Sequence, residues 1–415
     1  MSDSATTQTR NEQQSDTSQL TNPTLVLNCG SSSIKYALIS EDASTRITGL
    51  AENLGLDTAR IKHTSLSGEK LEISIPGGRH KLALQKILEL LEQYHFVAVG
   101  HRGVHGGREY SEAVQVTDHV LSEVKRLKSL APLHNPANAL GIEAVQAIYP
   151  NIPQVVVFDT AFHQTMPAVA YRYPIPKALY EDHKIRRYGF HGTSHAYVSE
   201  RASQITKADG PHGWLTAHLG NGCSAAAVYD GKSLDTSMGL TPLEGLMMGT
   251  RSGDVDPSLH IHLKRQLDMS LEDIDKMLNG DSGLLGISGL SNDMRTVEEA
   301  ANEGHKDAEL AIEMFAYRAG KYLAALSCAL PEFTGIIFTG GIGENSASTR
   351  ARILNVMRHF GISFDADKNK TLVGGAEGSF HQDTSEVELW VIPTDEEYRI
   401  AQETLQALRH SLGVD

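Results

Sequence analysis

Three glycine-rich segments could hold the phosphate groups of a nucleotide. Residues 29–33 and 220–224 are turns of small residues between apolar runs, and residues 340–346 follow the apolar run 335–339. Backbone N–H groups that no side chain covers can cradle a phosphate even where no helix begins. Tight turns alone also select glycine, but three such segments in one chain favour nucleotide binding.

Other nucleotide-binding motifs are missing or do not fit. The Walker pattern G-x-x-x-x-G-K-[ST] does not occur in the sequence. Residues 220–225 match the dinucleotide pattern G-x-G-x-x-[GA], but the turn pair Asp230-Gly231 follows too soon for the crossover helix of a Rossmann fold. A dinucleotide-dependent oxidoreductase is therefore a remote alternative.

Two arginines and a histidine stand in segments that let the backbone approach a ligand. Arg102 and Arg251 have glycines nearby, and His191 is followed by Gly192. A guanidinium group binds carboxylate or phosphate through paired hydrogen bonds, although a single arginine more often forms a surface ion pair. His191 and His195 have the i, i+4 spacing of zinc ligands, but the glutamate of H-E-x-x-H is absent. An anionic substrate is the stronger interpretation.

The elements that must position these residues follow an α/β pattern. Apolar runs at residues 97–100, 155–158 and 335–339 predict buried strands, each followed directly by polar residues or glycine. Apolar residues at helical spacing predict helices at residues 81–92, 138–148 and 307–330. Because α/β proteins bind ligands at the carboxyl ends of their strands, we expect the site there. We expect a loop at residues 340–346.

Composition argues against several classes of protein. The 415 residues include 37 Lys and Arg against 51 Asp and Glu, and the net charge of −14 argues against non-specific binding to nucleic acid or an anionic membrane. Three cysteines are too few for a disulfide framework, so a reducing compartment, the cytoplasm, is expected. No apolar run could span a bilayer, and residues 1–23 are expected to form a disordered tail rather than a signal peptide.

Five segments resemble the acetokinase family of short-chain carboxylate kinases. They are residues 27–35, 158–167, 187–195, 238–254 and 338–345. The resemblance extends over nearly the whole chain. It implies reversible transfer of the γ-phosphoryl group of ATP to acetate, giving acetyl phosphate and ADP, with a propionate kinase of the same family as the alternative. A non-catalytic nucleotide switch on the same scaffold is the rival from another class, but a switch needs no carboxylate anchor.

The resemblance also implies an architecture. The family has two duplicated actin-like α/β domains, of the acetate and sugar kinase type, around a cleft. Placed on this chain, residues 24–170 form the carboxylate domain and residues 171–394 the nucleotide domain, and a helix at residues 395–412 joins the first domain. The family implies a homodimer, ATP or ADP as co-substrate, and Mg²⁺ with Mn²⁺ as an alternative metal.

The family's functional residues map onto this chain by position. The implied catalytic residues are Asp159, His191 and Arg251. The residues implied to bind the carboxylate and its methyl group are Arg102, Val104, Leu133, Phe190 and Pro242. The implied nucleotide-binding residues are Lys35, His218, Leu219, Gly220, Asn221, Gly222, Asp293, Met294, Arg295, Gly341, Ile342, Gly343, Glu344 and Asn345. The implied metal ligands are Asn28 and Glu396.

Charge repulsion, rather than proton transfer, is the main obstacle to such a reaction. A carboxylate is already deprotonated at neutral pH, so Asp159 is expected to orient other groups rather than to act as a base. Arg102 and Arg251 are expected to neutralise the acceptor and the phosphoryl oxygens, while His191 donates a hydrogen bond to the moving group. We expect the phosphoryl group to pass directly, by in-line displacement, to the acceptor oxygen without a phosphoenzyme. The bulk of Val104 is expected to favour acetate over propionate. Because one methylene is worth only about 1–3 kcal/mol of discrimination, propionate should be a poorer but real substrate.

Overall fold

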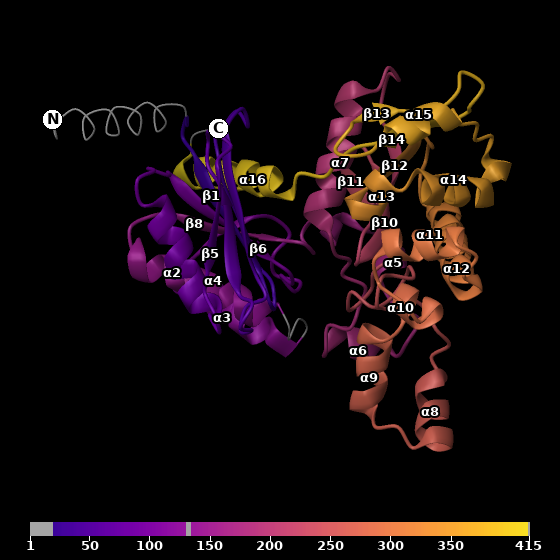
Figure 1. The fold of residues 1–415 in the computed structure, drawn as a ribbon, viewed down its shortest axis with the longest axis horizontal. Helices are drawn as coiled ribbons and strands as arrows, with labels where there is room; N and C mark the ends of the chain where they lie inside the picture. Colours follow the sequence, from indigo (N-terminus) through magenta and orange to yellow (C-terminus); the bar gives the residue numbers. More distant parts are fainter. Residues whose placement is uncertain (1–19, 130–133, 414–415) are drawn as a thin grey trace. The chain divides into compact units, whose positions relative to one another are not determined.

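The computed structural model describes residues 20–129 and 134–413, which form two compact units (Figure 1). Unit 1 is the described part of Met1–Ala161 and Asp395–Asp415, and unit 2 is Phe162–Thr394. We expected a boundary near residue 170, but the chain changes unit after Ala161. The reason is that residues just after this point already pack in unit 2, where His163 Nδ1 is 2.8 Å from Ser233 Oγ. Most of the expected tail lies outside the described residues.

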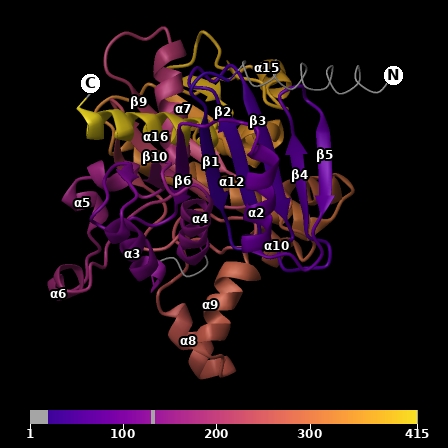
Figure 2. The ribbon, with the colours of Figure 1, turned by 90° about the vertical axis from the view of Figure 1, so that its left-hand side faces the viewer.

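Unit 1 contains a mixed sheet with helices on both faces (Figures 1 and 2). In chain order its strands are β1 (Thr24–Cys29), β2 (Ile34–Ile39), β3 (Arg46–Glu52), β4 (Arg60–Thr64), β5 (Lys70–Ser74), β6 (Ala98–Gly103), β7 (Val114–Gln115) and β8 (Gln154–Phe158). They are arranged in the sheet as β5-β4-β3-β2-β1-β6-β8-β7. The central strands β1, β6 and β8 run parallel, so their carboxyl ends meet at one edge of the sheet.

Alternate residues of the central strands face two separate cores. The helices of unit 1 are α2 (His80–Leu91), α3 (Asp118–Arg126), α4 (Asn135–Ile148) and α16 (Glu396–Leu412), with a short 3-10 turn at Leu127–Ser129. Leu25 and Leu27 of β1 pack in the core that α2 and α4 cover, whereas Val26 packs with Ile400 of α16. This alternation is what the period of two of a strand requires. The predicted helices at residues 81–92 and 138–148 are present as α2 and α4.

Unit 2 repeats the strand pairing of unit 1. Its strands are β9 (Gly213–Leu219), β10 (Cys223–Tyr229), β11 (Lys232–Thr236), β12 (Gly335–Thr339), β13 (Gly378–Ser379) and β14 (Glu388–Val391). The run β11-β10-β9-β12-β14 has two antiparallel pairs followed by two parallel pairs, as has β3-β2-β1-β6-β8 in unit 1. The predicted α/β class is confirmed, and the duplication is visible in this topology.

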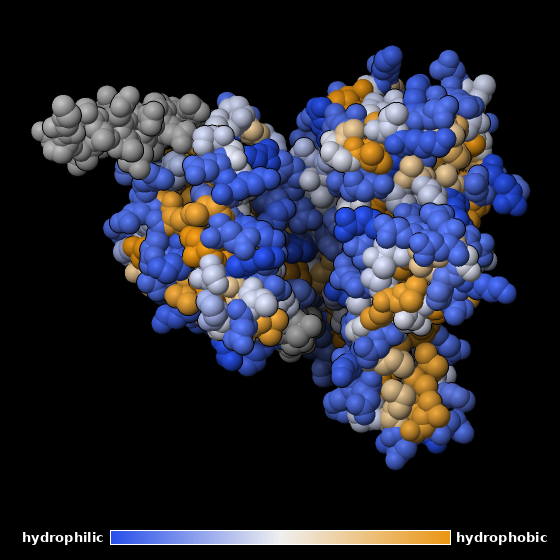
Figure 3. Space-filling model, viewed as in Figure 1, coloured by the Kyte–Doolittle hydropathy of each residue, from blue (hydrophilic) through white to orange (hydrophobic). Residues whose placement is uncertain are grey.

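Helices and short turns complete unit 2. They are a 3-10 turn at Phe162–Thr165, α5 (Ala168–Tyr171), α6 (Lys177–Glu181), α7 (Gly192–Ile205), α8 (Leu259–Leu267), α9 (Leu271–Gly280), α10 (Gly283–Ser288), α11 (Met294–Asn302), α12 (Lys306–Ser327), α13 (Gly340–Asn345), α14 (Ala347–Val356), a 3-10 turn at Arg358–Phe360 and α15 (Ala366–Thr371). Helix α7 packs against β9, β10 and β12. Helices α8 and α9 carry an apolar surface strip to which Ile261, Leu267 and Leu271 contribute (Figure 3).

The loop that we expected at residues 340–346 is mostly the short helix α13. Gly340 has a φ of +76°, which lets the chain turn sharply after β12. The carboxylate Oε1 of Glu344 accepts a hydrogen bond from the backbone N–H of Gly340 at 2.9 Å and one from Thr339 Oγ1 at 3.3 Å. A residue inside the helix therefore caps its beginning. None of the helices in the described ranges combines the length and apolar character needed to cross a membrane.

Two buried histidines of unit 1 should make the protein sensitive to acid. Burial lowers the pKa of His101 and that of His105 to about 4. On unfolding each pKa returns to its ordinary value of 6.5, so the unfolded chain binds more protons in this range. The stability that the neutral rings confer is complete above pH 6.5 and is lost as the pH falls toward 4. In this pH range each histidine should lower the free energy of unfolding by about 1.4 kcal/mol for each unit by which the pH falls.

Denaturant unfolding of His101→Gln between pH 7.5 and 5 tests this expectation. The free energy of unfolding of the variant should fall less steeply with decreasing pH than that of the wild type, by the amount that one bound proton causes. This difference in slope does not depend on the stability of the variant at pH 7.5. An unchanged slope in His101→Gln would show that His101 does not titrate on unfolding.

Candidate active site

In unit 1, Arg102 is held by side chains from neighbouring strand ends. It lies at the end of β6, and Asp159 follows directly after β8. Nε and Nη2 of Arg102 donate to the two carboxylate oxygens of Asp159 at 2.9 and 2.5 Å, and Nη1 donates to Asn28 Oδ1 at 3.2 Å. Asp159 is only 1% exposed, and the described residues use three of the five guanidinium N–H groups of Arg102. The remaining two can bind an anionic ligand.

The first turn of α16 brings more carboxylates to this cluster. Glu396 Oε2 is 3.9 Å from Arg102 Nε, and Glu397 forms an ion pair with Lys35 at 2.8 Å. Burial raises the pKa of Glu396, and the charges of Asp159 and Glu397 add to the increase, although Arg102 opposes it. Burial disfavours the charge of Arg102, but the neighbouring carboxylates raise its pKa above the ordinary value. The three carboxylates of this cluster outnumber its two cations, which favours a bound cation.

Asp395 stabilises the start of α16. Its Oδ1 accepts from the backbone N–H of Tyr398 at 3.1 Å, and Oδ2 accepts from Arg46 Nη1 at 2.7 Å. A helix-capping carboxylate of this kind stabilises a helix by about 1 kcal/mol. Asp395 therefore has a positioning effect on Glu396 and Glu397, which follow it.

In unit 2, a tight turn and two side chains converge. The turn 220–222 joins β9 to β10, and Gly220 N donates to Gly222 O at 3.1 Å. A methyl group on Cα of Gly222 would lie 3.4 Å from His191 Nε2 and 3.6 Å from Arg251 Nη1. Glycine at this position thus allows the imidazole and the guanidinium to approach the backbone of the turn.

The guanidinium of Arg251 contrasts with that of Arg102. Its Nη1 donates to Pro242 O at 3.1 Å and is 3.8 Å from the sulfur of Met248. Burial lowers the pKa of Arg251 below the ordinary value. Within residues 20–129 and 134–413 no carboxylate forms an ion pair with it. A partly buried cation without a carboxylate partner favours an anionic ligand.

His191 occupies an unusual backbone position at the start of α7. Its φ of +55° is in the left-handed region, which a residue with a side chain rarely adopts. Nδ1 is 2.8 Å from Ser224 Oγ, and the ring stacks on that of His218 with 4.3 Å between centroids. His218 Nδ1 is in turn 2.8 Å from Ser194 Oγ. The ring of His191 is therefore fixed by contacts on one nitrogen and on one face.

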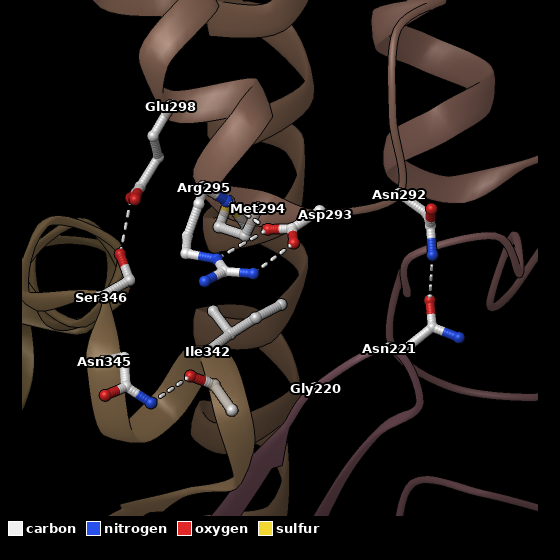
Figure 4. A pocket seen from close by; sticks show the side chains of 11 residues that line it. Gly220, Asn221, Asn292, Asp293, Met294, Arg295, Glu298, Ile342, Asn345 and Ser346 are labelled. Carbon is white, nitrogen blue, oxygen red and sulfur yellow. Dashed lines mark hydrogen bonds and ion pairs between the residues drawn. The ribbon is translucent and has the colours of Figure 1, made fainter. Parts of the chain in front are cut away.

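A cavity of about 520 Å³ lies beside this turn in unit 2 (Figure 4). The predicted residues that line it are Gly220, Asn221, Asp293, Met294, Arg295, Gly341, Ile342 and Asn345. Ser346, the last residue of the third glycine-rich segment, also lines it, together with Asn292 and Glu298, which we did not predict. Ser346 Oγ donates to Glu298 Oε1 at 2.5 Å, and Arg295 pairs with Asp293 at 2.8 Å. The cavity is large enough for a nucleoside, with polar groups on its wall.

Several predicted nucleotide residues do not line this cavity. Leu219 is fully buried in β9, and Gly343 O accepts from the buried Arg350 at 2.8 Å. Glu344 accepts from the backbone N–H of Gly340, as described for α13, and also from that of Thr394. Gly222 and His218 belong to the cluster around His191. Lys35 belongs to unit 1, where it pairs with Glu397. Leu219 is thus packed inside unit 2, and Gly343 and Glu344 bond other parts of the same unit.

The residues predicted for the acyl pocket come from both units. Val104 follows β6 by one residue and is 6% exposed, and its N–H donates to Asn138 Oδ1 at 3.2 Å. Phe190 is buried in unit 2, and Pro242 bonds Arg251 through its carbonyl. Leu133 lies outside the described residues. The structure therefore describes the surroundings of Val104 in unit 1 and of Phe190 and Pro242 in unit 2.

Arg187, which we did not predict as a functional residue, supports the segment that carries Pro242 and Arg251. Its Nη1 donates to the carbonyl oxygens of residues 236, 237 and 238 at 2.8–3.2 Å. Its Nη2 forms an ion pair with Glu244 at 2.6 Å, and Tyr173 also donates to Glu244. This network fixes the backbone of the loop after β11.

Known proteins resemble this chain over nearly its full length. A sequence model of the Acetokinase family matches residues 23–402. An acetate kinase of Pseudomonas aeruginosa (strain LESB58) is 52% identical over 389 residues, which are 92% of this chain and 98% of that protein. An acetate kinase of Deinococcus radiodurans is also 52% identical, over 92% of this chain and 97% of its own length.

Solved structures show the same fold. A propionate kinase from Francisella tularensis has a TM-score of 0.88 at 45% sequence identity, covering 93% of this chain and 99% of its own. An acetate kinase from Porphyromonas gingivalis has a TM-score of 0.87 at 44% identity, covering 93% of this chain and 100% of its own.

Proposed function

Since this chain belongs to the acetokinase family, we propose that it acts as an acetate kinase, transferring the γ-phosphoryl group of ATP to acetate reversibly. The product pair is acetyl phosphate and ADP. The observation that carries the proposal is the pair of clusters around Arg102 and around His191 with Arg251. One offers free guanidinium N–H groups beside a fixed carboxylate, and the other offers a cation without a carboxylate partner beside a glycine turn.

Trapping the acyl phosphate with hydroxylamine tests the proposed function. The full chain is incubated with ATP, acetate, Mg²⁺ and hydroxylamine, and acetyl hydroxamate is measured. We expect hydroxamate to form only when ATP and acetate are both present. ATP hydrolysis that does not depend on acetate, with no hydroxamate, would refute the assignment and favour a nucleotide switch.

The cavity in unit 2 is the proposed binding site of the nucleoside. Gly220 and Asn221 line it and belong to the β9–β10 turn, whose backbone N–H groups are suited to phosphate oxygens. Gly222, at the end of this turn, places the phosphates beside His191 and Arg251. We propose Lys35 as a further phosphate contact, because its ammonium group is exposed and borders the cluster of unit 1.

Arg102 is the proposed anchor of the acetate carboxylate. The guanidinium of Arg102 donates two hydrogen bonds to the carboxylate of Asp159, which fixes the guanidinium plane and supports the expected orienting role of Asp159. No general base is required, because acetate is ionised at neutral pH. Arg102 and Arg251 reduce the repulsion between acceptor and phosphoryl group, and His191 donates to the phosphoryl oxygens. These effects are positioning and electrostatic stabilisation, which dominate catalysis of phosphoryl transfer.

Asn28 and Glu396 are the proposed protein ligands of a divalent metal, Mg²⁺ or in its place Mn²⁺. Amide and carboxylate oxygens fit a hard cation. In the described part of the chain no group of three His, Cys, Asp or Glu residues could hold a metal by itself, which fits a metal that arrives with the nucleotide and is bound partly by phosphate oxygens. When bound, such a metal neutralises phosphate charge. The chain's own contribution is to hold the carboxylate of Glu396 in place through α16.

Replacing Val104 by alanine should change the preference between acetate and propionate. Val104 is buried directly after the strand that carries Arg102, so its bulk is proposed to limit the acyl chain. We expect the ratio of kcat/KM for propionate to that for acetate to rise by about tenfold or more, because one methylene is worth about 1–3 kcal/mol. Steady-state kinetics with both acids measure the ratio.

The matched control for this prediction is Val120→Ala. Val120 is 4% exposed in unit 1 and packs in a different core, between α3 and β8. It loses the same two methyl groups, so the ratio should stay at the wild-type value. A wild type that prefers propionate would replace the acetate assignment by propionate kinase.

We further propose a homodimer, as the family resemblance implies. Helix α8 has no buried residue, and Leu267 and Leu271 at the α8–α9 junction are 65% and 62% exposed. An exposed apolar strip of this kind supports association with another protein surface.

A further inference from the structure

A chain of hydroxyl and imidazole groups leads from His191 into the interior of unit 2. His191 Nδ1 is 2.8 Å from Ser224 Oγ, and the same oxygen is 2.7 Å from His195 Nε2. His195 Nδ1 is 2.7 Å from Thr216 Oγ1. Ser224, His195 and Thr216 are all 0% exposed. His195 lies in the first turn of α7 and His191 directly before this helix, whereas β9 and β10 supply the two hydroxyl groups. The chain of groups therefore depends on the packing of α7 against this sheet.

The single proton of the Ser224 hydroxyl couples the two histidines. It faces two ring nitrogens, so one nitrogen donates to the oxygen and the other accepts from it. Burial lowers the pKa of His195 well below the ordinary value, and the neighbouring His163 and His218 add to the effect, so this ring carries one proton. If that proton is on Nε2, Ser224 donates to His191 Nδ1, and neutral His191 has its proton on Nε2. If it is on Nδ1, neutral His191 has a bare Nε2.

The distances around Thr216 favour the first arrangement. In that arrangement Thr216 donates its proton to His195 Nδ1 across 2.7 Å. In the second arrangement His195 donates to Thr216, and the threonine proton is left with Ala226 O at 3.4 Å. A hydroxyl hydrogen bond normally spans about 2.5–3.0 Å, so the longer contact is weak. The threonine proton is therefore better placed on the histidine.

The charges around His191 favour the same arrangement. Nε2 of His191 and Nη1 of Arg251 meet at Gly222, and the ring of His191 stacks on His218. Three titratable groups that lie next to the ring are Arg251, His218 and, through Ser224, His195. All three are basic, so they do not stabilise an imidazolium as a carboxylate would. A neutral ring with a proton on Nε2 donates a hydrogen bond without placing a second positive charge beside Arg251.

We propose that Ser224, His195 and Thr216 are positioning residues that hold His191 as the neutral tautomer with its proton on Nε2. The inference rests on the proposed function for its consequence, which is that His191 donates a hydrogen bond to the transferring phosphoryl group without exchanging a proton. The tautomer itself is a property of the resting protein and is independent of the substrate.

Nuclear magnetic resonance of the full chain, labelled with ¹⁵N-histidine, tests the tautomer at pH 7. Long-range ¹H–¹⁵N correlations distinguish a protonated from a bare ring nitrogen, and the spectrum of His191→Gln identifies the signals of His191. We expect a bare Nδ1 and a protonated Nε2. A proton on Nδ1, or protons on both nitrogens, overturns the proposal. This outcome is separate from the hydroxamate test, because no substrate is present.

Kinetics of Ser224→Ala test the positioning effect. We expect kcat to fall by about 10- to 100-fold, by analogy with the loss of a group that orients a metal-binding histidine, with the KM values for ATP and acetate nearly unchanged. The signals of His191 in this variant should show a mixture of tautomers. Wild-type kcat together with an unchanged His191 tautomer contradicts the proposal.

The matched control is Ser199→Ala. Ser199 is 2% exposed on α7, and its hydroxyl donates only to the backbone oxygens of His195 at 2.7 Å and Ala196 at 3.1 Å. The variant loses a buried serine hydroxyl one turn beyond His195 without changing the coupling through Ser224. It should keep the wild-type kcat and the wild-type tautomer. A loss in Ser199→Ala equal to that in Ser224→Ala would show that general loosening of α7, not the tautomer, causes the effect.

Discussion

Replacing Arg251 by alanine is expected to lower kcat by about 10³- to 10⁵-fold, the range for loss of a transition-state arginine in phosphoryl transfer. The guanidinium is partly buried, bonds the carbonyl of Pro242 and has no carboxylate partner in the described part of the chain. Its charge is therefore available for the proposed contact with the phosphoryl group. The KM values for ATP and acetate should change much less, because the interaction strengthens as charge develops in the transition state.

Two variants separate this role from a general effect of charge. Arg265 is exposed on α8, and Arg265→Ala should keep the wild-type kcat. Arg251→Lys keeps the positive charge but not the planar fork of donors, so it should recover only part of the activity. Near-normal turnover of Arg251→Ala, with an unchanged circular dichroism spectrum, would remove Arg251 from the mechanism.

Replacing Arg102 by alanine should weaken acetate binding and the fold together. The KM for acetate is expected to rise by about 10- to 100-fold, since a charged hydrogen bond contributes about 1.5–3 kcal/mol. The KM for ATP should change little, because the nucleotide cavity belongs to unit 2. The free energy of unfolding should fall by about 3–5 kcal/mol, because Asp159 then remains buried without its partner. Steady-state kinetics and denaturant unfolding measure the two effects.

A double variant separates the two effects. Arg102→Met with Asp159→Leu replaces the buried ion pair by apolar side chains of similar volume, which is often neutral or stabilising. We expect the stability to return while activity with acetate stays low. Recovery of the acetate KM along with the stability would mean that Arg102 only supports the fold and that another group binds the carboxylate.

Residue types and spacing were sufficient to predict the parts of the site that lie at strand ends. Arg102 ends β6 and Asp159 follows β8, and because these strands are parallel neighbours the two side chains meet. The β9–β10 turn at Gly220 was visible as a glycine turn between apolar runs. These features depend on local sequence and on the rule that parallel strands end at one edge of a sheet.

Contacts that depend on tertiary packing could not be predicted in the same way. Ser224 and Thr216 look like ordinary strand residues, and only the register of β9 with β10 and the position of α7 bring them to the histidines. Helix α13 was missed because its cap, Glu344, lies inside the helix rather than before it. Glu298 lies one turn along α11 from Met294, so helical spacing was a signal that could have identified it.

Strand β5 shows a different limit of sequence reasoning. Its residues Lys70–Ser74 are mostly exposed, with a partly buried Ile73, so no apolar run marks the strand. Pairing with β4 over its full length defines it instead. Hydrophobic periodicity identifies strands that contribute to a core, and an edge strand with a mainly exposed surface gives little of that signal.

A crystal structure with ADP, acetate and aluminium fluoride bound tests most directly whether Arg102, His191 and Arg251 act on one transferring group. We expect Arg102 to contact the acetate carboxylate, and His191 Nε2 and Arg251 to contact the fluoride atoms, each at about 2.7–3.2 Å. Acetate held elsewhere, with Arg102 contacting only Asp159 and Asn28, would contradict the proposed mechanism.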